Sequence, residues 1–286
     1  IAAGAVSAAA GAAVALLGAS ALGSAWRTAA VMVGCVAASP LILSVFAVGM
    51  LSLWENAFDI VTTPRLHELL NASQPLIKKM MTSAPGTYHH SMMTAALAEG
   101  AAQAIGANAL LARAGALYHD VGKLRRPNYF MENQKSANIH DTLPPEESAA
   151  VIIAHQRDAE PLLSRYRIPS AVRRIAAEHH GTTLVAYFYQ KAVRQRGEDA
   201  EGTLDEKPYR YPGPEPTTRE SAIVMLADSC EAAVRSMQEP TRDEMAAMIR
   251  RVIQGKIDDG QLNKAPLTLA EITRIEKSFL VTMNGL

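Results

Sequence analysis

Histidine and aspartate residues follow one another in an ordered series through the middle of the chain. Imidazole nitrogens and carboxylate oxygens are common ligands of transition-metal ions. The side chains of the series exceed the needs of one ion and suit two ions that share a carboxylate, as in binuclear hydrolases. Burying so many imidazoles as plain packing residues would carry a desolvation cost that metal ligation offsets. The series consists of His90, His119, Asp120, His155, His179, His180 and Asp228.

Three histidines stay outside this series. A single histidine on a helix is usually a packed or solvated residue, and His67, His89 and His140 receive that interpretation by default.

Helix-compatible sequence surrounds each member of the series. Apolar residues on one stripe predict a helix over 87–105 that carries His90 and ends at Gly106. A second helical segment, 109–118, leads directly into His119 and Asp120. His155 is expected near the end of a helix that begins at Pro144 to Glu147. His179 and His180 follow the helical segment 171–178. Asp228 is expected inside a helix that begins with a capping box of Thr217 and Glu220.

The remaining sequence favours an all-α fold. Strand-like alternation is nearly absent, and its best instance is the short segment 184–189. The charged, Gly- and Pro-containing segment 190–216 is typical of a surface loop. Lys and Arg total 28, as do Asp and Glu, so no basic excess indicates a nucleic-acid polymer as partner.

Two uncharged segments, 1–26 and 28–54, precede the series and are separated only by Arg27. Each exceeds the roughly 20 residues that cross a bilayer as a helix. We therefore expect two transmembrane helices within residues 1–54, with Gly23 and Ser24 near their turn. The first segment lacks the basic start of a signal peptide. An Ala-rich soluble hairpin is the alternative.

The polarity of the chain changes after the apolar segments. Charged residues appear from Glu55, and Pro64 interrupts the chain, so residues 55–64 are interpreted as a linker. Residues 65–286 then form one domain that carries the whole series. Because the chain begins at Ile1 and not at Met, we expect it to be part of a longer protein.

The order of the series resembles that of the HD-domain phosphohydrolases, an all-helical superfamily. Within it, several motifs are similar to those of the seven-transmembrane HD proteins of the PgpH type, from about Pro64 to the C-terminus. The resemblance implies a multi-pass protein of the bacterial plasma membrane whose cytoplasmic domain hydrolyses the messenger cyclic di-AMP to linear pApA. The motifs are 86–91, 119–123, 132–134, 178–182, 210–214, 259–262 and 267–269.

The resemblance also implies a division of the ligands between two ions. One ion is expected to bind His90, His119 and Asp228, and the other His155, His179 and His180. Asp120 is the natural bridging carboxylate, because each of its oxygens can bind one ion. Mixed imidazole and carboxylate ligation suits iron or manganese better than magnesium, and a bridging hydroxide would be the nucleophile.

Other residues are candidates for contacts with the substrate. Lys123 follows Asp120 closely and is expected to reach a phosphate oxygen or to protonate the leaving group, with a surface lysine as the alternative. A rigid Pro-containing segment could present an arginine and an aromatic ring to a nucleotide, a disordered insertion being the alternative. The tentative substrate contacts are Asn133, His140, Arg210 and Tyr211.

Two other classes of function compete with a membrane-anchored cyclic di-AMP phosphodiesterase. One is an HD enzyme for cyclic di-GMP or a mononucleotide, but the Gly-Tyr-Pro motif of the cyclic di-GMP group is missing after His180. The other is a non-catalytic HD signalling receptor, which the intact ligand series disfavours. The expected partners are cyclic di-AMP and the lipid bilayer, and the sequence leaves a homo-oligomer open.

Overall fold

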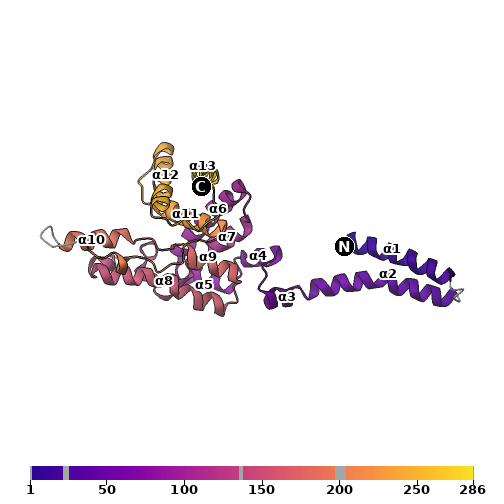
Figure 1. The fold of residues 1–286 in the computed structure, drawn as a ribbon. Helices are drawn as coiled ribbons and strands as arrows, with labels where there is room; N and C mark the ends of the chain where they lie inside the picture. Colours follow the sequence, from indigo (N-terminus) through magenta and orange to yellow (C-terminus); the bar gives the residue numbers. More distant parts are fainter. Residues whose placement is uncertain (1, 22–25, 135–137, 197–203, 286) are drawn as a thin grey trace. The chain divides into compact units, whose positions relative to one another are not determined.

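Our computed structural model describes residues 2–21, 26–134, 138–196 and 204–285, and helices joined by turns and short extended segments make up this part of the chain (Figure 1). Over these ranges the β-structure is a single bridge between Leu184 and Arg210. The predicted all-α fold is therefore confirmed. The chain divides into two compact units, Ile1–Ile60 and Val61–Leu286, and this division falls inside the predicted linker 55–64.

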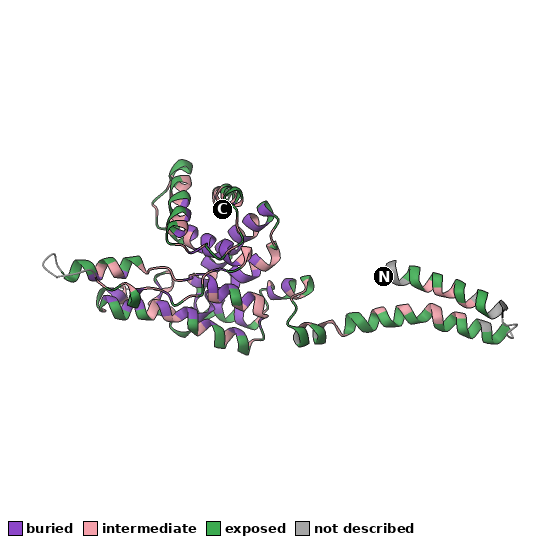
Figure 2. Ribbon diagram, in the orientation of Figure 1, coloured by how far each residue is buried: buried purple, intermediate pink, exposed green. Residues whose placement is uncertain are grey.

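The first unit consists of α1 (Ala2–Ala21), α2 (Trp26–Gly49) and α3 (Leu51–Phe58). Helices α1 and α2 pack along each other, and both are largely exposed (Figure 2). Among the described residues, α2 is the one helix long and apolar enough to cross a membrane, while the apolar helical stretch in α1 is the shorter Ala5–Ala15. The second span stays a prediction, and the expected turn at Gly23 and Ser24 lies outside the described residues.

The second unit is a helical domain built around α6, α7, α9 and α11, which pack on one another. Its centre is buried (Figure 2), and α11 contributes a continuous buried run from Ser221 to Asp228. Small side chains such as Ala98 and Ala101 let the central helices approach closely. Its α-helices are α4 (Thr63–Leu69), α5 (Pro75–Ser83), α6 (Pro85–Ile105), α7 (Ala109–Tyr118), α8 (Pro145–Arg165), α9 (Ser170–Glu178), α10 (Ala186–Arg196), α11 (Arg219–Arg235), α12 (Arg242–Asp258) and α13 (Leu269–Gly285).

Local sequence signals fix the ends of two of these helices. Gly106 ends α6 in the left-handed conformation, with φ of 70°, which glycine adopts without steric cost. Asn108 begins α7, because its side chain accepts a hydrogen bond from the backbone N–H of Leu111 at 3.0 Å. Short 3-10 turns follow α7: η1 (Val121–Arg125), η2 (Pro127–Tyr129), η3 (Met131–Asn133) and η4 (Ile139–Asp141), with η5 (Lys207–Tyr209) further on.

Three local predictions differ from the structure. His155 lies in the middle of α8, because that helix continues past it to Arg165 and buries Ala159 and Leu163 on the way. The segment predicted as a loop from residue 190 is helical as far as Arg196, the end of α10. The same helix replaces most of the possible strand 184–189, and residues 197–203 of the predicted loop lie outside the described residues.

The predicted capping box of α11 is wrong by one residue. Thr218 is the N-cap, and its hydroxyl accepts from the N–H of Ser221 at 3.1 Å. Thr217 instead donates its N–H and its hydroxyl to the carboxylate of Glu178, at 3.0 and 2.7 Å. The carboxylate of Glu220 accepts from the N–H of Asn108 at 2.8 Å. Long-range contacts therefore replace the local box.

Candidate metal centre

The histidines and aspartates of the series meet at one point of the second unit. They come from α6, α8 and α11 and from the residues that follow α7 and α9. Their ligand atoms form two groups, and within each group these atoms lie within 4.8 Å of one another. One group is His90, His119 and Asp228, and the other is Asp120, His155, His179 and His180.

Three imidazoles are held by backbone carbonyls of their own helices. His119, His155 and His179 each place Nδ1 beside the carbonyl oxygen three residues earlier in the chain. A carbonyl only accepts hydrogen bonds, so Nδ1 carries the proton and Nε2 presents its lone pair to the cluster. This tautomer is the one that binds a metal through Nε2. The carbonyls belong to Ala116, Ile152 and Ala176, at 2.6, 2.6 and 2.7 Å.

His90 is oriented by a carboxylate. Its Nδ1 lies 2.5 Å from Oε2 of Glu231, and its Nε2 lies 3.0 Å from Oδ1 of Asp228. Histidine ligands of metals usually donate their second N–H to such a partner. Glu231 comes from the last turns of α11 and is buried. Sequence reasoning missed this residue, because nothing in its neighbours distinguishes it from a surface glutamate.

Asp120 lies between the two groups. Its Oδ1 is 3.2 Å from Nε2 of His155, and its Oδ2 is 3.3 Å from Nε2 of His119. Oδ2 also forms an ion pair with Nζ of Lys123 at 2.7 Å. Both oxygens are buried, and Lys123 is the one donor beside Oδ2, whereas Oδ1 and Nε2 of His119 have no hydrogen-bond partner among the described residues. Buried polar atoms normally have such partners, so these orphaned atoms fit cations bound on both sides of Asp120.

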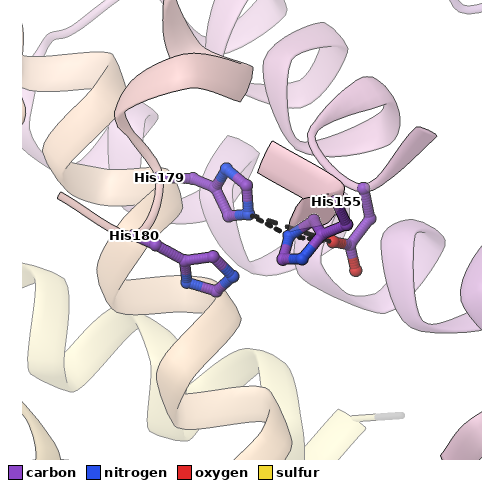
Figure 3. A group of neighbouring side chains, drawn as sticks. His155, His179 and His180 are labelled. Atoms are coloured by element: carbon purple, nitrogen blue, oxygen red, sulfur yellow. Dashed lines mark hydrogen bonds and ion pairs between the residues drawn. The ribbon is translucent and has the colours of Figure 1, made fainter. Parts of the chain in front are cut away.

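In the second group, the imidazole nitrogens of His155 and His179 face each other. Figure 3 shows the rings of His155, His179 and His180 gathered together, and Nε2 of His155 lies 3.3 Å from Nε2 of His179. Both Nδ1 atoms are already donors to carbonyls. Two neutral rings would therefore direct lone pairs at each other, and only a proton or a cation between them makes the contact favourable.

The electrostatics of the two groups differ. Burial alone would lower the pKa of His119, but Asp120 and Asp228 beside it raise that pKa to about 10. Burial, together with the neighbouring His119, lowers the pKa of His179 to about 3. Burial opposes the charge of Asp120, yet His119 and Lys123 hold the pKa of this carboxyl well below its ordinary value. Without metal, a proton on His119 balances the carboxylates, whereas burial keeps the imidazoles of His155, His179 and His180 neutral.

The turn after α9 brings two adjacent histidines to the cluster. Gly181 lies in the turn after α9 and has a φ of 51°, a conformation that disfavours any side chain. The amide of Gln261 then holds the next residue, because it accepts from the N–H of Thr182 at 2.8 Å and donates to its hydroxyl at 2.9 Å. Arg210 donates to the carbonyl oxygen of Thr182 at 3.0 Å and pairs with Asp259 at 3.1 Å. This set of contacts fixes the position of His180.

A cavity of about 520 Å³ opens onto the cluster. His90, His155, His180 and Asp228 form part of its wall. The wall also contains three cationic residues and several aromatic rings: Lys123, Arg235, Lys256, Tyr129, Phe130, Tyr187, Phe188 and Tyr211.

The structure separates the four tentative substrate contacts into two pairs. Tyr211 and His140 line the cavity, and the ring of Tyr211 stacks on His180 with centroids 4.1 Å apart. Arg210 and Asn133 do not belong to the cavity wall in the described chain. Arg210 lies in the contacts around Thr182, and Asn133 accepts from the N–H groups of Gly86 and Thr87 at the start of α6, at 3.0 and 3.2 Å.

Lys123 lies at the edge of the cluster. Its Nζ is 2.7 Å from Asp120 and 2.9 Å from Glu132. Burial would lower the pKa of this amine, but the two carboxylates raise it above its ordinary value. Glu132 in turn accepts from the hydroxyl of Thr87 on α6, at 3.1 Å. Lys123 is thus a fixed positive charge in the cavity wall, and not the surface lysine that was its alternative.

Comparison with known proteins agrees with this architecture. The sequence pattern of the HD domain matches residues 87–233, more than half of the chain. The chain belongs to the HD-domain family. The chain is 45% identical over 244 residues to the cyclic-di-AMP phosphodiesterase PgpH of Bacillus subtilis (strain 168), and the match covers 85% of the chain and 34% of that protein. PgpH of Listeria monocytogenes (serotype 1/2a, strain 10403S) is 45% identical over 243 residues, covering 85% of the chain and 33% of that protein.

Solved structures give the same relationship. The crystal structure of the L. monocytogenes PgpH HD domain in complex with cyclic di-AMP has a TM-score of 0.71 and 46% identity, and the match covers 75% of this chain and 99% of that one. A second crystal structure of the same domain has a TM-score of 0.70 and 46% identity, covering 74% of this chain and 99% of that one. The chain spans about a third of the length of the curated relatives that it matches.

Proposed function

We propose that this chain is a membrane-anchored, metal-dependent phosphodiesterase that hydrolyses cyclic di-AMP to linear pApA. The observation that carries the proposal is Asp120, whose two buried oxygens face two separate groups of imidazoles, and members of both groups line a cavity. Its relatives in B. subtilis and L. monocytogenes are named cyclic-di-AMP phosphodiesterases, which favours this substrate over cyclic di-GMP or a mononucleotide.

The proposed cofactors are two iron or manganese ions. His90, His119 and Asp228 would hold one, His155, His179 and His180 the other, and Asp120 would contact both. When bound, two such ions supply an activated water and neutralise charge on the phosphate oxygens. The chain itself supplies the fixed orientation of the imidazoles through Ala116, Ile152, Ala176 and Glu231.

Other residues of the cavity would bind the substrate. Lys123, held between two carboxylates, would contact an oxygen of the phosphate that is cleaved. Aromatic residues of the wall offer faces on which adenine bases stack, an interaction worth about 1–3 kcal/mol per base. The rings of Tyr129, Tyr187 and Phe188 are the candidates for this contact, together with Tyr211.

The proposed location of the domain is the cytoplasmic side of the plasma membrane. Helix α2 is the proposed anchor, and the second unit follows it in the chain. Cyclic dinucleotides are made and read in the cytoplasm, so the domain must face that side to meet its substrate. A reporter fused after Leu286 should then be active inside the cell. Activity only outside the cell would contradict the proposed substrate.

The direct test is hydrolysis of a panel of cyclic dinucleotides by the purified full chain in detergent with manganese. We expect cyclic di-AMP to be converted to pApA, identified by chromatography, with about two manganese ions bound per chain. The Asp120→Ala variant is the matched inactive control. Preferential cleavage of cyclic di-GMP would overturn the substrate, and metal loading without hydrolysis of any dinucleotide would favour the signalling receptor.

A further inference from the structure

Lys256 occupies a core position of α12. Ile249, Ile253 and Lys256 recur at helical spacing, and all three are buried, with exposed fractions of 0, 3 and 9%. The first two pack in the main hydrophobic core. A buried ammonium group costs free energy unless a partner compensates its charge. A lysine at this position therefore calls for a specific partner.

The partner of Lys256 in the protein is neutral. Its Nζ donates a hydrogen bond to the hydroxyl of Thr183 at 2.9 Å, in the turn that follows His180. Across the described ranges of the chain, Lys256 forms no ion pair within 4.0 Å. Burial lowers its pKa below the ordinary value, although Asp228 and Asp259 act in the opposite direction. Lys256 and its partner Thr183 both line the cavity that opens onto the metal centre, which brings the lysine within reach of an anion bound there.

The other cations of the cavity wall already have carboxylate partners. Lys123 lies between Asp120 and Glu132. Arg235 has its Nε 3.7 Å from Glu231, and its side chain is 45% exposed. Among the described cations of the wall, Lys256 is thus the one that is buried and has no carboxylate within ion-pair distance. Lys256 contacts Thr183, in the turn after His180, whereas Lys123 contacts Asp120.

We propose that Lys256 binds the second phosphate of a cyclic dinucleotide, the one that is not being cleaved. This inference rests on the proposed function. A cyclic dinucleotide carries two phosphodiester anions in one ring, so both enter the cavity together. The metal centre and Lys123 compensate the phosphate at the reaction site. The other phosphate loses its hydration in the same cavity and needs a cation of its own. Lys256 supplies this cation, and because its ammonium group is already buried, its desolvation adds no further cost when the substrate binds.

Two substrates separate this role from a general one. Cyclic di-AMP has a second phosphate, whereas bis(p-nitrophenyl) phosphate has one phosphodiester and no other anion. The full chain in detergent with manganese would be assayed on both, as wild type, Lys256→Met and Lys256→Arg. Methionine keeps the length and the apolar stem of the lysine but removes its charge. Lys264→Met is the matched control, because Lys264 is a surface lysine paired with Glu215 and its side chain is 64% exposed.

We expect Lys256→Met to raise KM for cyclic di-AMP about ten- to a hundredfold, the range for one lost hydrogen bond to a charged group. Its kcat/KM for bis(p-nitrophenyl) phosphate should stay at the wild-type value. Lys256→Arg should recover part of the binding of cyclic di-AMP, and Lys264→Met should match the wild type on both substrates. Metal content and thermal unfolding accompany each assay. If Lys256→Met does not fold, Lys256→Gln, which retains a donor to Thr183, takes its place.

Several results would overturn the inference. An equal loss on both substrates would assign Lys256 to the cleaved phosphate or to the integrity of the metal centre. Wild-type KM for cyclic di-AMP in the Lys256 variants would show that the second phosphate is bound elsewhere. Failure of the proposed function has a different signature: the wild type would hydrolyse bis(p-nitrophenyl) phosphate but not cyclic di-AMP, and the inference would fall with it.

Discussion

Glu231 should control the affinity of the metal centre although it is not expected to touch a metal. Its carboxylate lies 2.5 Å from Nδ1 of His90, and its side chain is 8% exposed. A hydrogen bond to a charged group contributes about 1.5–3 kcal/mol. Replacing such a partner of a metal-ligating histidine typically costs about 10–100-fold in metal affinity.

Two variants of Glu231 separate the contribution of its charge to metal affinity from the contribution of its hydrogen bond. Glu231→Gln retains an acceptor oxygen and loses the charge, so we expect manganese affinity to fall about tenfold, the lower end of the range. Glu231→Ala leaves Nδ1 of buried His90 without its partner, so we expect a loss of about 100-fold. In both variants, excess manganese should restore most of the hydrolysis, because the ligands themselves remain.

The assay is a manganese titration of the metal-free chain, followed by calorimetry and by hydrolysis of cyclic di-AMP. Glu99→Gln is the matched control, because Glu99 lies on α6 with His90 but pairs with Arg113 at 2.6 Å. The reasoning is refuted if Glu231→Ala binds manganese as tightly as the wild type. It is also refuted if Glu99→Gln loses as much affinity, since the effect would then belong to α6 as a whole.

Three further predictions concern the same centre. Asp120→Ala should abolish hydrolysis and lower the metal content by both ions while the helical circular dichroism persists, whereas His67→Ala should stay active; retained activity in the first variant would contradict the bridging role. Manganese binding should release protons, because His119, with a pKa of about 10 in the metal-free centre, must lose its proton; affinity should therefore rise with pH, and a pH-independent calorimetric titration would contradict this. Gln261→Leu should lower the melting temperature by a few degrees and weaken metal retention, because Thr182 loses two hydrogen bonds; unchanged melting and metal content would contradict it.

The gathering of the histidines and aspartates of the series at one point could be predicted from their residue types and their order in the chain. Imidazoles and carboxylates that recur at the ends or inner faces of helices are costly to bury unless they bind a metal, and the segment 109–118 matches α7. Glu231 and Lys256 could not be predicted in the same way. Each carries a charge that is typical of a surface residue, and only the packing of α11 and α12 buries them beside the cavity. The ion pair of Arg210 with Asp259 could not be predicted either, because the two residues lie far apart in the chain; the contact of Arg210 with a nucleotide stays a prediction.

The error at the start of α11 has a physical cause that bears on function. Thr217 and Glu220 satisfy the local rule for a capping box, but the carboxylate of buried Glu178 accepts both hydrogen bonds of Thr217. Glu178 is the residue directly before the histidine pair, and α11 carries Asp228. The contact therefore ties the end of one ligand-bearing helix to the start of another. A local signal failed here because a long-range contact that positions the two ligand groups replaced it, as is expected near functional sites.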